Sequence, residues 1–593
     1  MTDRDRRASE ALIVSVLAAA TGGVYLLTLA PSVVAGNSAE YQYTAYILGI
    51  AHSTGYPLYT LLGKLFTLLP VGSIAYRMNL LSAAAAVLAA ILVYAIVQRL
   101  TGHRALALAV ALAFAFAATF WATALIAEVH TLNAAFIALD VYLLLRWADR
   151  QRAAPCSRTR WEGLRGFALA YGLSLTHHRM SLLLAPAFLV FIVLTLRSGH
   201  RQAAEPASNG QRPEKIYQHP AVVTMLIFLL PFALYAYIPL RGHAFLSESD
   251  PVVTALYEDR VPEAVLRGTV TAHYRQSAAG FFNLVTGKDY AVDVGIESWE
   301  QLSEQLTTWA ALLIRQFTVV GAFASGLGAA LLLRHDWRRA IFLLLGYGSL
   351  VGFALIYVGH GQIWYYYMPS YIFLAGFMGF AADRIGTLLA NQLAPMAGRR
   401  GWQRHVRTTY FSLWFLLPLA LLLQNWTTVD MSHHYIDQAR ALDVLSRDLE
   451  EGAVILGPWD LVSSVRYYQH AEGIRPDLVV IHADPAYSTG EKIIRRSLIL
   501  HRPLYILSPA PLDAARLQVL GKWVRLDPIP YYRTVNVQGP TANYGNELAL
   551  LGVSVSPNPA ELRGGAGAAL YVQIYWRVLT NIEQRYKVFL HLL

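Results

Sequence analysis

The chain has 593 residues, of which 55% are hydrophobic and only 15% are charged. Soluble domains carry about 25% charged residues, so this composition excludes a soluble enzyme, a disordered chain and a coiled coil. The single cysteine, Cys156, excludes an intramolecular disulfide framework and a Cys-x-x-Cys metal site. The net charge of +10 comes from short basic clusters between apolar runs and not from a continuous basic stripe, so nucleic acid is not an expected partner.

The apolar runs predict a polytopic α-helical membrane protein. A membrane-spanning helix needs about 20 mostly apolar residues. By that criterion we expect about eleven spans, near residues 11–30, 79–98, 105–124, 130–146, 164–180, 181–196, 220–240, 307–333, 340–358, 366–383 and 408–425. No convincing small-residue cleavage site follows the first run, so it is interpreted as a span and not as a signal peptide.

The basic clusters predict the orientation. They fall in alternate connections between the spans, beginning with Arg4, Arg6 and Arg7, and Lys and Arg mark the cytoplasmic side of membrane proteins. We therefore expect an integral plasma (inner) membrane protein with a cytoplasmic N-terminus. The opposite loops would be 31–78, 122–129, the turn near 177–180, 241–306 and 359–365. An odd number of spans would place the tail, 426–593, outside the cytoplasm.

The tail has a different pattern. Residues 453–457, 477–483 and 503–508 are short apolar runs typical of buried strands, and they alternate with helical stretches at 433–450, 460–472 and 488–501. That alternation predicts an extracytoplasmic α/β domain with a parallel sheet, over residues 426–535. From about residue 545 the pattern has a period of two, at 571–578 and 586–592, which predicts the start of a β-sandwich over 540–593 that is truncated in mid-strand. The membrane domain would cover 1–425.

Several motifs resemble a known family. The stretch 30–82 contains GNSAEYQ and HSTGYPLY, and further matching segments lie at 121–136, 172–186, 237–242, 363–371 and 457–481. Together they closely resemble the protein O-mannosyltransferase-like family of GT-C membrane glycosyltransferases. The resemblance implies a GT-C-like fold and an inverting transfer of a sugar, with mannose the first expectation, from a polyprenyl-phosphate lipid. The acceptor would be an extracytoplasmic protein or glycan, such as a Ser or Thr hydroxyl of a protein, and neither a metal nor another cofactor is expected.

The first outer loop departs from the family pattern at one position. The family usually has Gly-Asp-Ser-x-Glu there, whereas this chain has Gly36-Asn37-Ser38-Ala39-Glu40. An Asn amide cannot accept a proton at neutral pH. Two hypotheses follow: either Glu40 is the catalytic base and Asn37 positions the sugar, or the protein is a catalytically impaired pseudo-enzyme that binds the sugar lipid. From sequence alone, Glu40 is equally well explained as a first-turn acid of a helix capped by Ser38.

A transporter is a weaker alternative, because no internal repeat is visible.

Other ionisable residues collect at the membrane edge on the outer side, where the energetic cost of burying charge makes them functional candidates. Glu128 and His130 either contact the acceptor or an active-site histidine, or simply mark the edge of the lipid. His52 and Tyr56 either contact the donor phosphate or belong to a surface turn.

The sharpest basic group on the outer side is formed by His177, His178 and Arg179. An Arg fork with neighbouring imidazoles suits a lipid phosphate, although snorkelling of Arg179 to the interface explains it too. Adjacent helical residues point about 100° apart, which disfavours zinc binding by the two histidines. We extend the phosphate hypothesis to Arg241 in the segment PLRGH.

Overall fold

The computed structural model describes residues 3–153, 161–202, 220–246, 277–288, 294–296, 298–357, 363–393, 402–482, 503–506, 542–544, 548–556 and 571–578. It divides into two compact units. The first unit comprises Met1–Leu445 with Trp459–Val480, and the second comprises Ser446–Pro458 with Ile481–Leu593. The predicted domain boundaries at residues 425 and 535 stay a prediction.

The described part of the first unit is helical almost throughout. Its α-helices are α1 (Asp3–Thr28), α2 (Asn37–Ile47), α3 (Pro57–Thr67), α4 (Ile74–Thr101), α5 (Arg104–Ala115), α6 (Ala118–Ala124), α7 (Val129–Ala153), α9 (Arg165–His177), α10 (Ala185–Gln202), α11 (Pro220–Leu229), α12 (Tyr237–Leu246), α14 (Ala278–Thr286), α15 (Trp299–His335), α16 (Trp337–Ile356), α17 (Trp364–Tyr367), α18 (Tyr371–Leu393), α19 (Trp402–Leu413), α20 (Leu416–Val429), α21 (Ile436–Leu445) and α22 (Trp459–Ala471). Short 3-10 helices are η1 (Arg179–Leu184), η3 (Leu230–Ala236) and η5 (Met368–Ser370).

The polytopic helical membrane fold is confirmed. Within the described ranges, nine helical segments are long and apolar enough to cross a membrane, or ten if the pair α5–α6, bent by 70°, is one span. These segments coincide with ten of the eleven predicted runs. The remaining run, 164–180, contains α9, whose 13 residues extend only about 20 Å at 1.5 Å per residue, short of a hydrocarbon core of about 30 Å. The helix ends because His178 adopts an extended conformation and accepts a hydrogen bond from the Met180 N–H.

The core of the bundle is formed by α4, α7, α15 and α18. In this core α4 packs against α7 and α18, and α18 packs against α15. Small residues allow close approach between helix backbones in membrane proteins. Gly328 of α15 shows this, because a Cβ atom placed there would lie 1.9 Å from the Phe377 carbonyl oxygen of α18. Large side chains such as Trp121 and Trp147 fill the remaining space and are fully buried.

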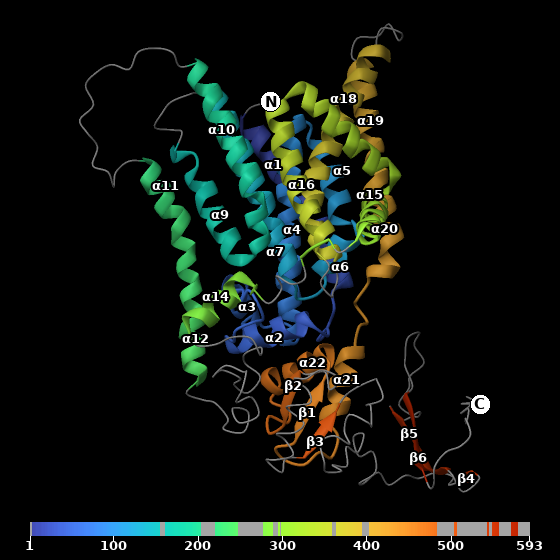
Figure 1. Cartoon of the computed structure of the whole chain (residues 1–593). Helices are drawn as coiled ribbons and strands as arrows, with labels where there is room; N and C mark the ends of the chain where they lie inside the picture. Colours follow the sequence, from blue (N-terminus) through green and yellow to red (C-terminus); the bar gives the residue numbers. More distant parts are fainter. Residues whose placement is uncertain are drawn as a thin grey trace. The chain divides into compact units, whose positions relative to one another are not determined.

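The short helices of the outer loops gather at one end of this bundle. Figure 1 shows α2, α3 and α14 at the end opposite to the start of α1. The helices α21 and α22 lie at the same end, where α22 packs against α2. The helices α2, α3 and α14, from loops that the sequence assigns to the outer side, therefore share one end of the first unit.

The strands in the described residues are β1 (Val454–Gly457), β2 (Val479–His482), β3 (Leu504–Ile506), β4 (Ala542–Tyr544), β5 (Leu548–Ser556) and β6 (Tyr571–Val578). In the second unit β1 pairs with β3 in parallel, as predicted, with Val454 opposite Leu504. The strands β4, β5 and β6 form an antiparallel sheet. β6 coincides with the predicted strand 571–578, whereas the predicted helix 488–501 and strand 586–592 lie outside the described residues.

Candidate functional site

The centre of the candidate site is the contact between Glu40 and His52. Gly36, with φ of 80°, precedes α2, and Glu40 lies one turn into that helix with no exposed surface. The His52 backbone N–H donates to Glu40 Oε1 at 2.9 Å, and the His52 Nδ1 atom is hydrogen-bonded to Glu40 Oε2. Burial alone would lower the pKa of His52, but the Glu40 carboxylate and its hydrogen bond outweigh burial and raise it. Both carboxylate oxygens are thus held by one residue.

Tyrosine rings surround this pair. The Tyr41 hydroxyl lies 3.3 Å from His52 Nε2, and the Tyr41 ring packs edge-on against Tyr56 and Tyr59 at 5.6 and 5.3 Å between centroids. Tyr56 occupies a left-handed conformation, with φ of 42°, at the start of α3. That backbone geometry is costly for a residue other than glycine, so the packing of the ring must compensate for it. The aromatic wall fixes the orientation of the His52 imidazole.

Three histidines from two helices continue the cluster. His130 at the start of α7 lies 5.4 Å from His178, measured between ring centroids, and stacks on Tyr365 at 4.7 Å. His178 also lies 6.0 Å from Tyr56. His177 Nε2 donates to the Val129 carbonyl at 2.9 Å, so its Nδ1 is an acceptor in the neutral ring. Within the described residues, the Nδ1 atoms of His130 and His177 are buried and have no hydrogen-bond partner.

Glu128 lies directly before α7 and is 5% exposed. Its backbone N–H donates to Ser82 Oγ at 2.9 Å, and Ser82 Oγ donates to the Glu128 carbonyl. Within the described part of the chain, Oε2 of its carboxyl group has no hydrogen-bond partner. Burial raises the pKa of Glu128 to about 8. At neutral pH the group is therefore mostly a carboxylic acid, which can donate a hydrogen bond to a ligand.

Two arginines lie at the margin of the cluster. Arg179 donates from Nη1 to the carbonyls of Thr286 and Gly287, at 2.8 and 3.2 Å. Arg241 donates to the carbonyls of Leu48 and Ile47, at 2.7 and 3.1 Å. These last carbonyls of α2 carry its partial negative charge, so Arg241 stabilises the end of the helix that bears Glu40.

Asn37 lies apart from the cluster, at the exposed start of α2. Its Oδ1 accepts a hydrogen bond from Trp459 Nε1 of α22 at 3.0 Å. The structure therefore brings together seven of the ten residues singled out in the sequence. Of the other three, Arg179 lies at the margin of this cluster, Asn37 lies at the start of α2, and Arg241 contacts the end of α2. The seven are Glu40, His52, Tyr56, Glu128, His130, His177 and His178.

The sequence-based reasoning did not single out Tyr41, Tyr59 or the stacking of Tyr365 on His130. Tyr41 had a visible signal, because it directly follows Glu40 in the motif. The roles of these tyrosines depend on contacts between distant segments, which local patterns do not reveal.

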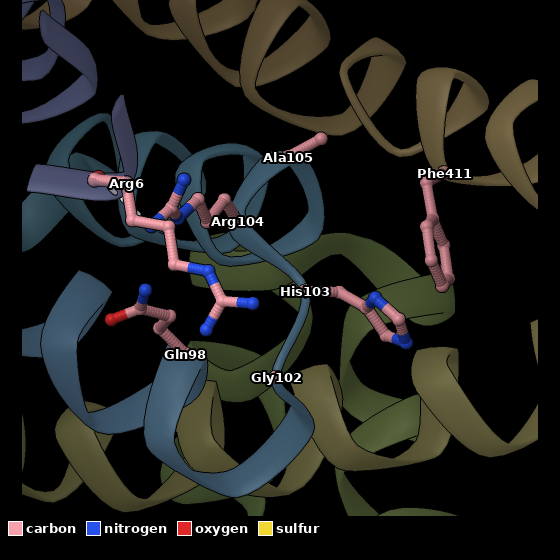
Figure 2. Close-up of a pocket in the computed structure, with 7 residues that line it drawn as sticks. All are labelled: Arg6, Gln98, Gly102, His103, Arg104, Ala105 and Phe411. Atoms are coloured by element: carbon pink, nitrogen blue, oxygen red, sulfur yellow. Dashed lines mark hydrogen bonds between the residues drawn. The ribbon is translucent and has the colours of Figure 1, made fainter. Parts of the chain in front are cut away.

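Among the described residues, no group of three or more His, Cys, Asp or Glu side chains is arranged to hold a metal ion. A separate pocket of about 440 Å³ is lined by Arg6, Gln98, Gly102, His103, Arg104, Ala105 and Phe411 (Figure 2). It lies at the opposite end of α4 from Ser82. Arg104 is paired with Glu10 at 2.7 Å and His103 contacts Asp383 at 3.1 Å, so the pocket is distinct from the cluster.

Known proteins resemble this chain in sequence and in fold. Residues 37–201 match the family model described as the protein O-mannosyl-transferase TMEM260 N-terminal domain. The chain is 27% identical over 484 residues to mouse protein O-mannosyl-transferase TMEM260, covering 80% of this chain and 62% of the mouse protein. It is 24% identical over 495 residues to protein O-mannosyl-transferase tmem260 of Dictyostelium discoideum, covering 77% of this chain and 55% of that protein. The chain thus spans less than two thirds of the length of these relatives.

The fold is similar to the crystal structure of ArnT from Cupriavidus metallidurans bound to undecaprenyl phosphate. The TM-score is 0.50 at 11% sequence identity, and the match covers 85% of this chain and 90% of ArnT. The resemblance that the first loop carries is thereby confirmed: this is an integral membrane protein with a GT-C-like fold, and its residues 37–201 match the family model of the protein O-mannosyl-transferase TMEM260 N-terminal domain.

Proposed function

We propose that this protein is a membrane glycosyltransferase that moves a sugar, with mannose the first candidate, from a polyprenyl-phosphate lipid to an extracytoplasmic hydroxyl group. The names of the mouse and Dictyostelium discoideum relatives support the transfer of mannose to protein. The undecaprenyl phosphate bound to ArnT supports a polyprenyl-phosphate donor. No metal or other cofactor is part of the proposal.

The observation that carries the proposal is the polar cluster at one end of the membrane bundle. Glu40, His52, Glu128 and His178 are each at most 14% exposed although they lie beside membrane-spanning helices. Ionisable groups at such depth are costly and mark sites of function. Their chemistry suits a phosphate ester, because the raised pKa of His52 favours its cationic form and the neutral Glu128 carboxyl can donate a hydrogen bond.

The proposed reaction is a displacement with inversion. The acceptor oxygen attacks the anomeric carbon of the sugar, the bond between that carbon and the phosphate oxygen breaks, and polyprenyl phosphate leaves with the electron pair. Arg179 and the neighbouring histidines would stabilise the leaving phosphate, and a carboxylate would take the proton of the acceptor hydroxyl. Glu40 stays the candidate from the sequence, and each of its two carboxylate oxygens is hydrogen-bonded to His52.

The orientation belongs to the same proposal. The start of α1, which bears Arg4, Arg6 and Arg7, would face the cytoplasm, as the distribution of Lys and Arg predicts. The end of the bundle with α2, α3 and the cluster would face outward, towards the acceptor. The α/β and β-sheet segments of the tail would be extracytoplasmic. Protease accessibility of the tail in sealed, oriented vesicles tests this arrangement.

The activity can be tested with the full chain in lipid nanodiscs. Radiolabelled mannosyl-phospho-polyprenol is supplied with peptides rich in Ser and Thr, and the label on the peptide is measured. We expect transfer by the wild type, a large loss in Glu128→Ala, and unchanged transfer in Asp443→Asn, which replaces an exposed carboxylate of α21. The wild type could instead bind the donor lipid and transfer neither mannose nor any other sugar from a polyprenyl phosphate. That result would contradict the proposal and favour the pseudo-enzyme.

A further inference from the structure

The helix α22 of the tail packs against the start of the first-loop motif, Gly36–Glu40. The Gly36 N–H donates to Ser463 Oγ at 3.1 Å, and Trp459 Nε1 donates to Asn37 Oδ1 at 3.0 Å. On α21, the preceding helix of the same unit, Asp437 accepts a hydrogen bond from the Ala35 N–H at 2.9 Å. Three consecutive residues of the first loop are therefore each held by the segment 437–463.

This docking brings a second carboxylate to the motif. A Cβ atom placed on Gly36 would lie 3.1 Å from Asp460 Oδ1, so the absence of a side chain at Gly36 lets the carboxylate approach the loop closely. The Asp460 side chain is exposed. In the described part of the chain, Asp460 accepts hydrogen bonds only with its backbone carbonyl oxygen, and its carboxylate makes no hydrogen bond and no ion pair. It is available to a ligand as it stands.

The two carboxylates near the motif differ in access. Glu40 is fully buried, and both of its oxygens are bonded to His52. A general base must come within about 3 Å of the hydroxyl whose proton it removes. Asn37 and Glu40 are three residues apart on α2 and so lie on the same face of that helix. Asp460 therefore lies beside the exposed first residues of α2. The buried Glu40–His52 pair lies one turn further along the same face of that helix.

We propose that Asp460 is the general base of the glycosyl transfer; this rests on the proposed function. The Asp460 carboxylate takes the proton of the acceptor hydroxyl while the acceptor oxygen forms its bond to the anomeric carbon. The bond from that carbon to the phosphate oxygen breaks, and polyprenyl phosphate leaves with the electron pair. Asn37, held by Trp459, positions the acceptor, and the Glu40–His52 pair positions the donor end of the site.

A purely structural role for Asp460 makes a different prediction. An acid in the first turn of α22 stabilises the partial positive charge at the start of the helix. Its loss would then lower the melting temperature without changing the pH dependence of turnover. A base has the opposite signature, because its protonation at low pH produces an acid limb in the pH profile of kcat.

The test compares Asp460→Asn, Glu40→Gln and Asp443→Asn in the full chain in nanodiscs, with transfer, donor binding and melting temperature measured for each. We expect Asp460→Asn to reduce kcat about 10²- to 10⁴-fold, to retain donor binding and melting temperature, and to lose the acid limb of its residual activity. Asp443→Asn should behave as the wild type.

Two results would overturn the assignment while leaving the proposed function intact: wild-type turnover in Asp460→Asn, or loss of the acid limb in Glu40→Gln alone. A loss of turnover in Asp460→Asn that only follows a loss of folded protein would also overturn it. A wild-type chain that binds the donor and transfers no sugar would refute both the function and the base.

Discussion

Glu40 and His52 form a closed pair in which both carboxylate oxygens of Glu40 are bonded to one histidine, through its backbone N–H and its ring. The Glu40 side chain is fully buried and that of His52 is 14% exposed. A buried charge needs a partner of this kind, and removing one member leaves the other uncompensated. The pair therefore fixes the loop between α2 and α3, on which the rest of the cluster is assembled.

Replacing Glu40 by Gln should destabilise the protein in a pH-dependent manner. Because the folded-state pKa of His52 is raised above 6.5, the stability from the charged pair is fully present below pH 6.5 and is lost as the pH rises through the folded-state pKa. We expect a deficit on the order of 1.5–3 kcal/mol near pH 6 that shrinks at higher pH.

Thermal unfolding of the two proteins between pH 5.5 and 9 measures this deficit. Glu10→Gln is a matched control, since Glu10 is paired with Arg104 and no histidine contributes to that ion pair. Its deficit should stay constant over the same range. A Glu40→Gln deficit that is equally independent of pH would refute the charged pair.

Replacing Glu128 by Gln should make the protein more stable than the wild type at high pH, in contrast to the replacement of Glu40. Its folded-state pKa is about 8, above the ordinary 4.5, so the wild type loses stability as the pH rises from about 4.5 to about 8. Gln has the shape of the neutral acid and does not titrate. Glu128→Gln should therefore match the wild type near pH 5 and exceed it by about 1–3 kcal/mol near pH 9.

Denaturation at the two pH values distinguishes these expectations. Glu304→Gln, which removes an exposed carboxylate of α15, is the control and should show no such crossover. Equal pH dependence of the wild type and Glu128→Gln would mean that Glu128 is already ionised in the folded protein.

The sequence allowed the membrane fold and most members of the cluster to be predicted, because both depend on local signals. Apolar runs indicate spans, and polar residues at their ends are conspicuous against lipid. The end of α9 at His177 agrees with the predicted turn near residues 177–180, whereas the short length of this helix was not predicted. The shortened helix depends on the extended conformation of His178, which hydrophobicity does not encode.

The pairing inside the site was equally hidden. Glu40 and His52 are twelve residues apart, and Asp460 reaches Gly36 from the other end of the chain. Such contacts are set by how helices pack and not by periodicity along one helix. For that reason the sequence does not reveal that α22 carries both Trp459 and Asp460 to the first-loop motif.

Gly287 should be intolerant of a side chain because of Arg179. Its φ of 58° is in the left-handed region, and a Cβ atom there would lie 2.1 Å from Arg179 Nη1. Gly287→Ala should therefore displace the guanidinium from the Thr286 carbonyl and cost about 1–3 kcal/mol. If Arg179 binds the donor phosphate as proposed, the affinity for labelled donor lipid should change as well.

Gly295→Ala is the control for this substitution, since a Cβ atom at Gly295 meets nothing within 4 Å. Thermal unfolding and donor binding are measured for both variants. Wild-type stability in Gly287→Ala would contradict the close packing of Arg179 against the loop after α14.

Asp437 should hold the start of α2 through its charge. It accepts hydrogen bonds from the Ala35 N–H at 2.9 Å and from His434 Nε2 at 2.8 Å. Burial alone would raise the pKa of Asp437, but these hydrogen bonds outweigh burial and lower it below 3.8. The stabilisation is thus present above pH 3.8 and is lost as the pH falls through the lower folded-state value.

Asp437→Asn keeps an acceptor oxygen for Ala35 but loses the charge, so we expect a loss of about 1–2 kcal/mol at neutral pH. Hydrogen–deuterium exchange of peptides covering residues 31–45 should accelerate, because the Ala35 and Gly36 amides are held by α21 and α22. Asp443→Asn, on the exposed side of α21, should leave the exchange unchanged. Unchanged exchange in Asp437→Asn would mean that the loop before α2 is held without this carboxylate, and that the contacts of α22 alone position Asn37 and Glu40.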